Sequence, residues 1–394
     1  MFLIRHSKPD DTATLFKLAR MVYFINLPPD ERIIDAKIQH SMQCFKTIAA
    51  GRTGVPRPSA SRPPVKKKAR RSGGEGGFAA SEHASHLFMF TIEDPESGSV
   101  IGTSQIRAHQ GGPGDPNWSM KLAERKFFSD SLGVGTTHTT AKLYGDETGP
   151  SEIGGLILQP SYRGHEARPG RFLSFVRFHF MALHRQIFAE RVLAEMMAPV
   201  TSDGDNVFWD HLGRKFIPVK YAEADRFCQH NRKFIPDLLP HEEIYLTLLP
   251  LEVLNTVGVV SRETIPARRM LESLGFKYRG FIDPFDGGPH LDAMTAEIPL
   301  VRDTRRAEVG KVTSADRCSG RAIVSVLTGE GEFRATECPC EAGASGPVRL
   351  PPEAMELLDV KPGASIGFTS LQNAPGAPKG AAPAKRRSTK RGGA

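Results

Sequence analysis

A turn rich in glycine and arginine carries residue types that bind phosphorylated ligands. It follows the apolar run Leu156, Ile157 and Leu158, and its candidate ligands are Arg163, Gly164, Arg168, Gly170 and Arg171. Glycines let backbone N–H groups approach an anion, and the N-terminus of the helix that follows adds partial positive charge. Arginines add charge-assisted hydrogen bonds. The turn therefore predicts a pyrophosphate site, and the alternative interpretation is a surface turn with solvated arginines.

A second stretch, residues 257–276, predicts a strand, a short loop and a helix. The apolar run at 257–260 is the expected strand, and the helix follows from Thr264. One helical face would carry Ala267, Met270, Leu271 and Leu274. Gly275 is placed to end the helix, and Phe276 packs after it. The pattern resembles the closing helix of GNAT-type acyltransferases, which borders the slot for acyl-coenzyme A. An ordinary amphipathic helix is the alternative.

The turn and the helix occur in the order and separation expected of a GNAT fold, and a narrower resemblance adds to them. Several strings resemble the arginine N-succinyltransferase family: 151–153, 156–160, 208–214, 265–268, 275–279 and 282–289. The most specific is Phe-Asp-Gly-Gly-Pro at 285–289. The resemblance covers residues 1–50 and 87–370. It implies an enzyme, an N-succinyltransferase that moves the succinyl group of succinyl-CoA to the α-amine of L-arginine in arginine catabolism.

Three features depart from the family pattern. The phosphate turn is longer than in the family, with Pro169 added. Ser261 stands where the family has a histidine regarded as a proton donor, and serine is no acid or base near neutral pH. Ser261 could still position a water or donate a hydrogen bond to the thiolate. The third departure is a pair of basic segments, at 51–74 and 372–394.

Acyl transfer needs a neutral amine, a site for the oxyanion and a proton for the departing thiolate. Backbone groups at 153–158 would hold the pantetheine arm and the oxyanion, and Leu156 aligns with a family CoA-binding position. Glu152 is the candidate base, alone or through water, unless it is one half of a surface ion pair. Ser261 is the second catalytic candidate, unless it only begins the helix. His241, which aligns with a family histidine, is the third, unless it is a structural loop histidine.

The guanidinium of arginine calls for a carboxylate that can bind it with two hydrogen bonds. Asp283 and Asp286 are the candidate substrate ligands, and the alternative is that both serve the turn. His165 and His290 are weaker candidates for a titratable role. No metal site is expected, because Cys338 and Cys340 are a close pair without a second pair nearby.

The elements that must position these residues predict an α+β protein. The expected architecture is a GNAT-like acyltransferase core, with a mixed twisted sheet flanked by helices, and a small β-rich C-terminal module. Expected strands are 2–5, 87–92, 100–106, 153–158, 192–196, 322–327, 333–336 and 348–350. Expected helices begin after Asp10 or Asp11, at 28–30 and at 171, the last running to 190. Residues 108–150 are expected to form a polar, glycine-rich loop with a short hairpin on the substrate side.

The charge distribution divides the chain. Its net charge is +8, yet the segments 51–74 and 372–394 are basic without a single acid, so the remainder is acidic. Both are rich in proline, glycine, serine and alanine and are expected to be disordered. The predicted division is a core at 1–50 and 87–300, a basic insert at 51–86, the module at 301–371 and a basic tail at 372–394. The basic arms predict at most weak, non-specific contact with nucleic acid.

Composition and cysteine usage limit the remaining possibilities. Five scattered cysteines and no signal peptide or apolar run of about 20 residues predict a cytoplasmic protein that does not cross a membrane. The family relation implies more than one subunit. Two other functions stay open: a GNAT-type N-acyltransferase for another amine or acyl-CoA, which Ser261 motivates, and a non-catalytic acyl-CoA-binding regulator, which the basic arms motivate.

Overall fold

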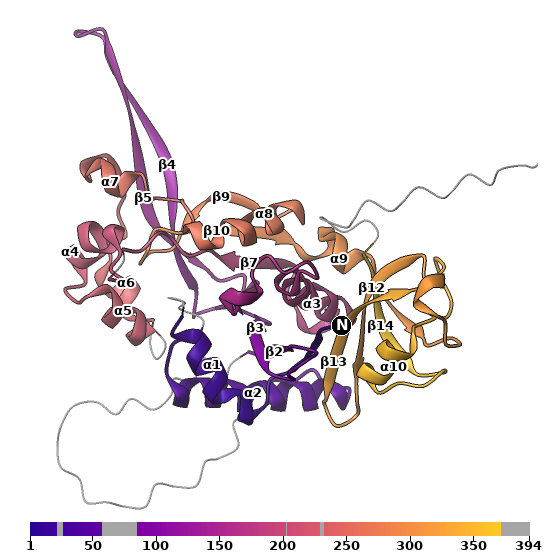
Figure 1. The fold of residues 1–394 in the computed structure, drawn as a ribbon. Helices are drawn as coiled ribbons and strands as arrows, with labels where there is room; N and C mark the ends of the chain where they lie inside the picture. The colour runs from indigo at the N-terminus through magenta and orange to yellow at the C-terminus, as the bar shows by residue number, and fades with distance from the viewer. Residues whose placement is uncertain (22–26, 57–84, 202, 229–231, 372–394) are drawn as a thin grey trace, which may run out of the picture.

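The computed structural model describes residues 1–21, 27–56, 85–201, 203–228 and 232–371. Its strands form one large mixed sheet in the order β11-β14-β12-β13-β1-β2-β3-β6-β7-β10-β9-β4-β5-β8. Helices lie against this sheet, so the fold is α+β (Figure 1). None of the helices in the described ranges is long and apolar enough to cross a membrane. The predicted basic tail and most of the basic insert, 57–84, lie outside the described residues.

The first half of the chain, apart from residues 117–146, forms the centre of the sheet. Its elements are β1 (Leu3–His6), α1 (Thr12–Ala19), α2 (Glu31–Ala49), β2 (Leu87–Glu93), β3 (Val100–Arg107), β6 (Ser151–Leu158), α3 (Pro169–Leu183) and β7 (Arg191–Glu195). The predicted first strand, first two helices and hairpin are confirmed. Asp30 begins α2 by accepting hydrogen bonds from the backbone N–H groups of Arg32 and Ile33. The spacing of the first helix predicts an inward face at Leu15, Leu18, Ala19 and Val22; the first three are buried, and Val22 lies outside the described residues.

The second half of the chain extends the sheet at both edges. Its helices are α4 (Arg214–Phe216), α5 (Tyr221–Cys228), α6 (Phe234–Leu238), α7 (Leu251–Leu254), α8 (Ile265–Ser273), α9 (Pro299–Arg302) and α10 (Pro352–Leu358). Its strands are β8 (Ile244–Tyr245), β9 (Lys277–Ile282), β10 (Pro289–Met294), β11 (Thr304–Glu308), β12 (Gly320–Leu327), β13 (Phe333–Cys340) and β14 (Ser365–Ser370). The expected strand at 348–350 is reduced to isolated bridges.

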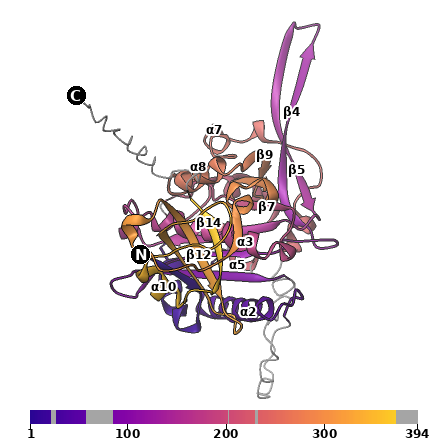
Figure 2. The same cartoon turned by 90° about the vertical axis from the view of Figure 1, so that its right-hand side faces the viewer.

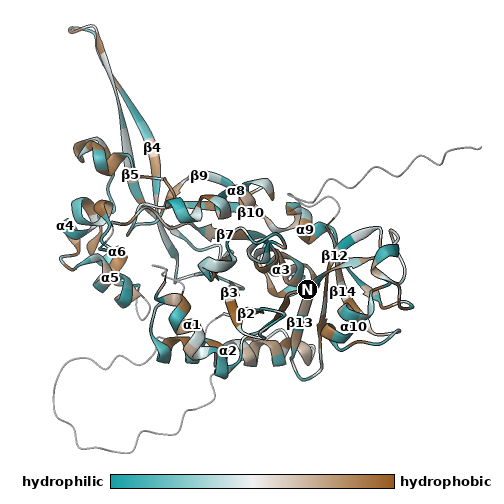
Figure 3. Cartoon of the chain, viewed as in Figure 1, coloured by the Kyte–Doolittle hydropathy of each residue, from teal (hydrophilic) through white to brown (hydrophobic). Residues whose placement is uncertain are grey.

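Apolar side chains alternate between the two faces of the central strands. Phe88 and Phe90 of β2 pack with α3, α8 and α9 in the main core, whereas Leu87 and Met89 pack with α1 and the first half of α2. Hydrophobic colours gather accordingly on central elements such as β3 (Figure 3). A third cluster joins α5 and α6 to the base of β4 (Asn117–Ser129) and β5 (Val134–Asp146).

The C-terminal module continues the main sheet. Strand β13 pairs with β12 on one side and with β1 on the other. Phe333 and Ala335 belong to the main core, while Val324 and Phe368 belong to a separate cluster with α10. The domain boundary at 300 therefore stays a prediction, because the two parts share both a sheet and a core.

Three further predicted elements differ from the structure. The expected short hairpin at 108–150 is a long arm, β4 (Asn117–Ser129) and β5 (Val134–Asp146), which projects from the body in both views (Figures 1 and 2). The helix expected to run to 190 ends at Leu183, because Ile187 and Phe188 turn back into the core. The strand expected at 257–260 is a turn, in which Gly258 has a φ of +71°.

A buried histidine joins α3 to the module. His179 Nδ1 lies 2.6 Å from Thr369 Oγ1, and its Nε2 lies 2.6 Å from Ser325 Oγ. Burial lowers the pKa of His179 to about 3 and that of the nearby His184 to about 4. Both are therefore neutral in the folded protein at pH 5, whereas the unfolded chain protonates them below about pH 6.5.

Acid is therefore expected to destabilise the fold. Because the unfolded state binds more protons, the two histidines lower the free energy of unfolding by roughly 4 kcal/mol between pH 7 and pH 5. Denaturant titrations at pH 7, 6 and 5 measure this, with His179→Gln as the comparison. The variant should lose about half of the pH dependence. An equal pH dependence in both proteins would contradict this account.

Candidate functional site

The strands β6 and β7 run parallel but pair over only two residues. Ser151 pairs with Val192 and Glu152 with Leu193, and beyond these pairs the strands part. Among the described residues, 153–158 of β6 then keep a strand partner on one side only, in β3. The backbone on their other side is left free to bind a ligand by hydrogen bonds.

Strand β6 also carries an irregularity next to this point. The register with β3 shifts between Thr103 and Gln105, and Gly155 has a φ of +55°. A Cβ at Gly155 would lie 3.1 Å from the side chain of Gln105, so both conformation and space favour glycine here. Leu156 and Leu158, two of the predicted cofactor residues, follow it and pack partly buried against the main core, whereas Ile157 is buried on the other face.

The predicted phosphate turn leads from β6 into α3. Gly164 has a φ of +79° and Arg168 is left-handed, and the helix starts directly after Arg168 at Pro169. The guanidinium of Arg163 lies 3.7 Å from the carboxylate of Glu263, so the turn lies beside the start of α8. Arg171 is taken up differently, because its guanidinium binds Glu337 of the module at 2.8 Å.

Helix α8 has the predicted terminator and the predicted apolar face. Leu271 and Leu274 are buried, and Gly275 ends the helix with a φ of +97°. Ser261 precedes the helix, and its backbone N–H donates to the Met197 carbonyl, two residues beyond β7. Its Oγ lies 3.0 Å from Thr264 Oγ1. Ser261 thus begins the helix beside the parted strands, and a catalytic role for it stays a prediction.

The turn between β9 and β10 holds the two predicted substrate carboxylates. Both oxygens of Asp286 accept backbone N–H groups, from Ala198 at 2.9 Å and from Gly288 at 2.7 Å. Asp283 uses Oδ1 for the backbone of Phe285 and Asp286, which leaves its Oδ2 facing His290. The structure thus gives Asp286 a structural task and leaves one oxygen of Asp283 for a ligand.

A buried group of ionisable residues surrounds Asp283. Nε2 of His290 lies 4.0 Å from Oε1 of Glu195 and 4.0 Å from Oδ2 of Asp283. The three ligand atoms lie within 4.8 Å of one another, close enough to hold a metal ion or another cation. Together with Asp225 and Arg232, Glu195 and Asp283 line a cavity of about 20 Å³.

Mutual interactions set the charges of this group. Burial lowers the pKa of His290, but Asp283 and Glu195 outweigh it and the net pKa is raised. Burial raises the pKa of Asp283, but His290 and two backbone N–H groups hold it below its usual range. Burial raises the pKa of Glu195. Burial and the nearby Asp283 raise that of Asp225 to about 6.

Not every predicted catalytic residue belongs to this group. Glu152 belongs to it. This residue is the last of β6 to pair with β7 and is 2% exposed, and its negative charge helps to raise the pKa of Glu195. Its carboxylate lies 3.9 Å from Arg107. His241 does not, because it is exposed and Nε2 bonds locally to the Pro236 carbonyl at 2.9 Å. A larger groove of about 560 Å³ between β1, β13 and α10 contains none of the predicted site residues.

Glu195 and Arg232 are not among the site residues predicted from the sequence, and His290 is one of the weaker candidates. Glu195 had a usable signal, because it directly follows the apolar run 192–194 and so lies at the end of a buried strand. Arg232 had none, because it lies in a polar stretch with no pattern of its own.

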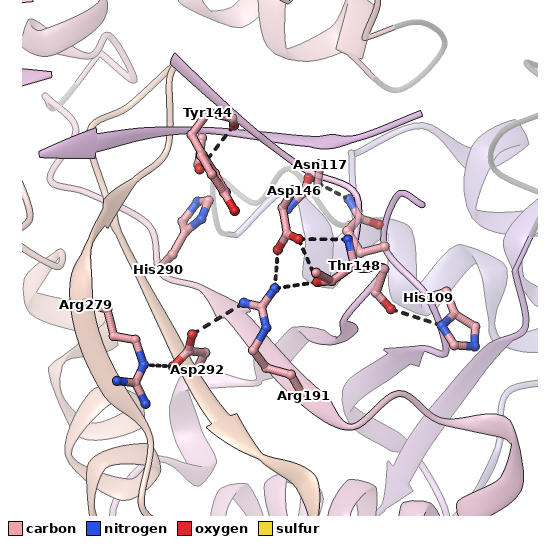
Figure 4. Close-up of polar contacts among 12 residues, drawn as sticks. His109, Asn117, Tyr144, Asp146, Thr148, Arg191, Arg279, His290 and Asp292 are labelled. Carbon is pink, nitrogen blue, oxygen red and sulfur yellow. Dashed lines mark hydrogen bonds and ion pairs between the residues drawn. The ribbon is translucent and has the colours of Figure 1, made fainter. Parts of the chain in front are cut away.

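An ion-pair network anchors the arm beside this site. The guanidinium of Arg191, in β7, bonds to Asp146 at the end of β5 and to Thr148 just after it. It also lies 3.4 Å from the carboxylate of Asp292 in β10, and this carboxylate binds Arg279 at 2.7 Å. Figure 4 shows the network with His290 nearby. It fixes the base of the arm over the polar face of β7 and β10.

Comparisons with known proteins agree with one another. The family model described as "Arginine N-succinyltransferase beta subunit" matches residues 60–300. A curated arginine N-succinyltransferase of Yersinia pestis (strain Pestoides F) is 33% identical over 379 residues, 94% of this chain and 98% of that protein. One of Shigella dysenteriae is 34% identical over 314 residues, 79% and 81% of the two chains. A solved structure, arginine/ornithine succinyltransferase subunit AI from Pseudomonas aeruginosa, matches with TM-score 0.72 and 26% identity over 94% of this chain and 99% of that one.

Proposed function

Because the chain belongs to the arginine N-succinyltransferase family and is an acyltransferase, we propose that it transfers succinyl from succinyl-CoA to the α-amine of L-arginine, the first step of an arginine-degrading pathway. Ornithine is a further candidate acceptor, since the similar Pseudomonas aeruginosa protein is described as an arginine/ornithine succinyltransferase. The single observation that carries the proposal is the parting of the parallel strands β6 and β7.

We propose that the acyl-CoA binds between these strands, as in a GNAT-type enzyme. Free backbone groups at 153–158 hold the pantetheine arm, and the bulge at Gly155 turns N–H groups toward the thioester oxygen. The pyrophosphate lies on the turn with Arg163, Gly164 and Gly170, at the start of α3. Arg171 contributes less, because Glu337 already neutralises it.

Proton transfer in the proposed reaction involves buried groups beside the parted strands. Glu152 is the proposed base, acting directly or through water, and the amine nitrogen then attacks the thioester carbonyl. As the C–N bond forms, the nitrogen gives up a proton. The C–S bond breaks, and the coenzyme A thiolate leaves with its electron pair and takes up this proton, directly or through water. Ser261 can donate a hydrogen bond to the thiolate but is no acid at neutral pH. The cationic acceptor lies against Asp283, which the turn-forming Asp286 holds in place.

The experiment is thiol release by the purified protein, with succinyl-CoA or acetyl-CoA as donor and L-arginine, L-ornithine or L-lysine as acceptor. Rapid release with the succinyl donor and arginine is expected, and donor without acceptor is the control. Release with some other amine alone would instead support the second candidate, a changed acceptor, which Ser261 favours. Tight CoA binding without any release would favour a regulator.

The proposal includes an assembly of more than one subunit in the cytoplasm. The family description and the solved structure both name a subunit. The arm carries exposed Phe127, Phe128, Leu132 and Val134 at its far end, and such apolar side chains favour association. All five cysteines are free thiols, as a reducing compartment would keep them. Light scattering in solution measures the assembly, and a monomer at all concentrations would contradict it.

A further inference from the structure

The far half of the arm has a free backbone edge on each side. Strand β5 pairs with β4 along its whole length, and its other edge pairs with β8 only at Thr140 and Ala141. Strand β4 pairs with β9 only at Met120 and Lys121. Among the described residues, 122–129 and 134–139 therefore keep a strand partner on one side only, and their outer N–H and C=O groups are open to another strand.

The body of the protein supports one face of this far half. On that face the guanidinium of Arg125 binds Glu243, and the ring centroid of Phe127 lies 6.5 Å from that of Tyr245. Phe128, which points to the opposite face, is 68% exposed. A two-stranded hairpin with so little packing is marginally stable in water. The arm therefore gains stability from a further strand or surface that covers it.

The two free edges differ in charge. Strand β4 carries Glu124, Arg125 and Lys126 along its edge, and charged side chains are a usual protection of an edge against pairing. The edge of β5, 134–139, reads Val-Gly-Thr-Thr-His-Thr and contains no aspartate, glutamate, lysine or arginine. Valine and threonine favour strands. The edge of β5 is therefore the one that can pair with another chain.

Exposed apolar side chains lie at both ends of this edge. At the tip of the arm, Leu132 is 77% exposed and Val134 is 55% exposed. At the base, Leu248 is 87% exposed and Leu251 is 72% exposed. Both leucines follow β8, the strand that occupies the edge of β5 at 140–141, and α7, which begins at Leu251, lies beside the arm (Figure 1). Exposed apolar patches of this kind mark interaction surfaces.

Antiparallel pairing with a second copy brings the tip and the base patches together. When residues 134–139 of one chain pair with the same residues of another, the tip of each arm lies level with the point where β8 joins the other arm. The offset of five residues corresponds to about 17 Å. Leu132 and Val134 of each copy then face Leu248 and Leu251 of the other, in one isologous two-fold interface.

Charge and size both suit a second copy. An edge without charged residues can face itself with no like charges directly opposite one another. Phe127 and Phe128 at the tip are 52% and 68% exposed, which amounts to roughly 250 Å² per chain. With the leucines and the paired edges of two chains, the buried area reaches about 1,000 Å², the size expected of a specific interface.

We propose that the edge 134–139 of β5 pairs antiparallel with the same edge of a second copy of this chain, with each tip packed against Leu248 and Leu251 of the other copy. The two arms then form one four-stranded ribbon in the order β4-β5-β5-β4. The inference rests on the assembly included in the proposed function and names the surface that forms it. Each arm thereby covers its uncharged edge, and only the charged edge of β4 stays open.

The test uses two double variants of opposite charge. One combines Thr136→Lys with Thr137→Lys, and the other combines Thr136→Glu with Thr137→Glu. The two positions point to opposite faces of the strand, so like charges meet in any register of a self-paired edge. Sedimentation velocity should show self-association at least about tenfold weaker than in the wild type for each variant alone. An equimolar mixture should recover wild-type association, because opposite charges then meet.

Lys126→Glu is the matched control. Lys126 pairs with Thr137 and so lies at the same height of the arm, but on β4. Its variant should associate like the wild type. Leu132→Ser, which removes an exposed apolar side chain from the tip without adding charge, should weaken association. Thiol release should stay within about twofold in all of these variants, because the far half of the arm contains none of the proposed site residues.

The outcomes separate this inference from the proposed function. Association of both charged variants at wild-type strength, or a mixture that associates no better than its components, would overturn the inference while the proposed assembly stands on another surface. Rapid thiol release by a protein that is monomeric at every concentration would leave the reaction intact and overturn both the assembly and this inference. Association that the lysine pair breaks, in a protein without thiol release, would support the interface and contradict the reaction.

Discussion

Replacing Gly288 by alanine is expected to lower the free energy of unfolding by about 3 kcal/mol, as overpacking of rigid backbone does, and to abolish most acyl transfer. A Cβ at Gly288 would overlap the carbonyl oxygen of Met196 and lie 2.9 Å from the backbone nitrogen of Ala198. Neither atom can move by a side-chain rotation. Relief therefore has to displace the end of β7 and, with it, Glu195. Denaturant unfolding and the thiol-release assay measure the two effects.

Gly329→Ala is the matched control for Gly288→Ala. A Cβ at Gly329 meets nothing within 4 Å, and this glycine has no positive φ. Its variant should keep both stability and activity. If Gly288→Ala behaved like Gly329→Ala, the turn 283–289 would not press on β7 as described.

The second large effect is expected at Arg191. Arg191→Met removes the ion-pair partner of Asp146 and one of the ion-pair partners of Asp292. Asp146 is 8% exposed and Asp292 is 9% exposed. Breaking a buried ion pair from one side leaves a charge without compensation. Because Arg191 is itself 28% exposed, the expected loss is about 2–3 kcal/mol, below the full buried-pair value. Denaturant unfolding at pH 7 measures it.

Two variants check the cause of this loss. Arg349→Met breaks an exposed pair with Glu341 and should change stability by less than about 1 kcal/mol. Adding Asp146→Asn to Arg191→Met should restore part of the loss, because the remaining side chain is then uncharged. A double variant less stable than Arg191→Met would show that packing of the Arg191 stem, and not charge, is responsible.

Local signals were enough to predict the central elements. Asp30 caps α2, Gly275 ends α8, and the strand expected at 153–158 from its apolar run is found as β6, Ser151–Leu158. The family resemblance was confirmed by the comparisons and supplied the function. What such signals share is that each lies within a few residues of the element that it specifies.

The arm could not be predicted, because its strands lack the pattern by which strands are recognised. Strands β4 and β5 pair over 13 residues, but the far half, 123–128 and 134–137, is exposed on both faces. A strand exposed on both faces needs no alternation of apolar and polar residues. Its threonines at 136, 137, 139 and 140 were the remaining hint.

The cavity could not be predicted for a different reason. Its residues come from β4, β7, α5, α6 with the segment before it, and the turn before β10, and no local spacing connects them. The resemblance pointed to Asp283, but only the pairing of β7 with β10 brings His290 opposite Glu195. The register between strands far apart in the sequence therefore determines this arrangement, and short-range sequence patterns do not reveal it.

The place of β1 in the sheet affects how the chain folds as it is synthesised. Residues 3–6 lie between β2 and β13. The ring centroid of Phe333, in β13, lies 5.3 Å from that of Phe180 and 5.4 Å from that of Phe90 in the main core. At roughly 5–20 residues per second, β1 leaves the ribosome many seconds before β13 exists. During that time one edge of β1 is unpaired, and such an edge invites pairing with other chains. The core closes only after the C-terminal strands emerge, and nascent chains that stop short of β13 are the species that chaperones must protect.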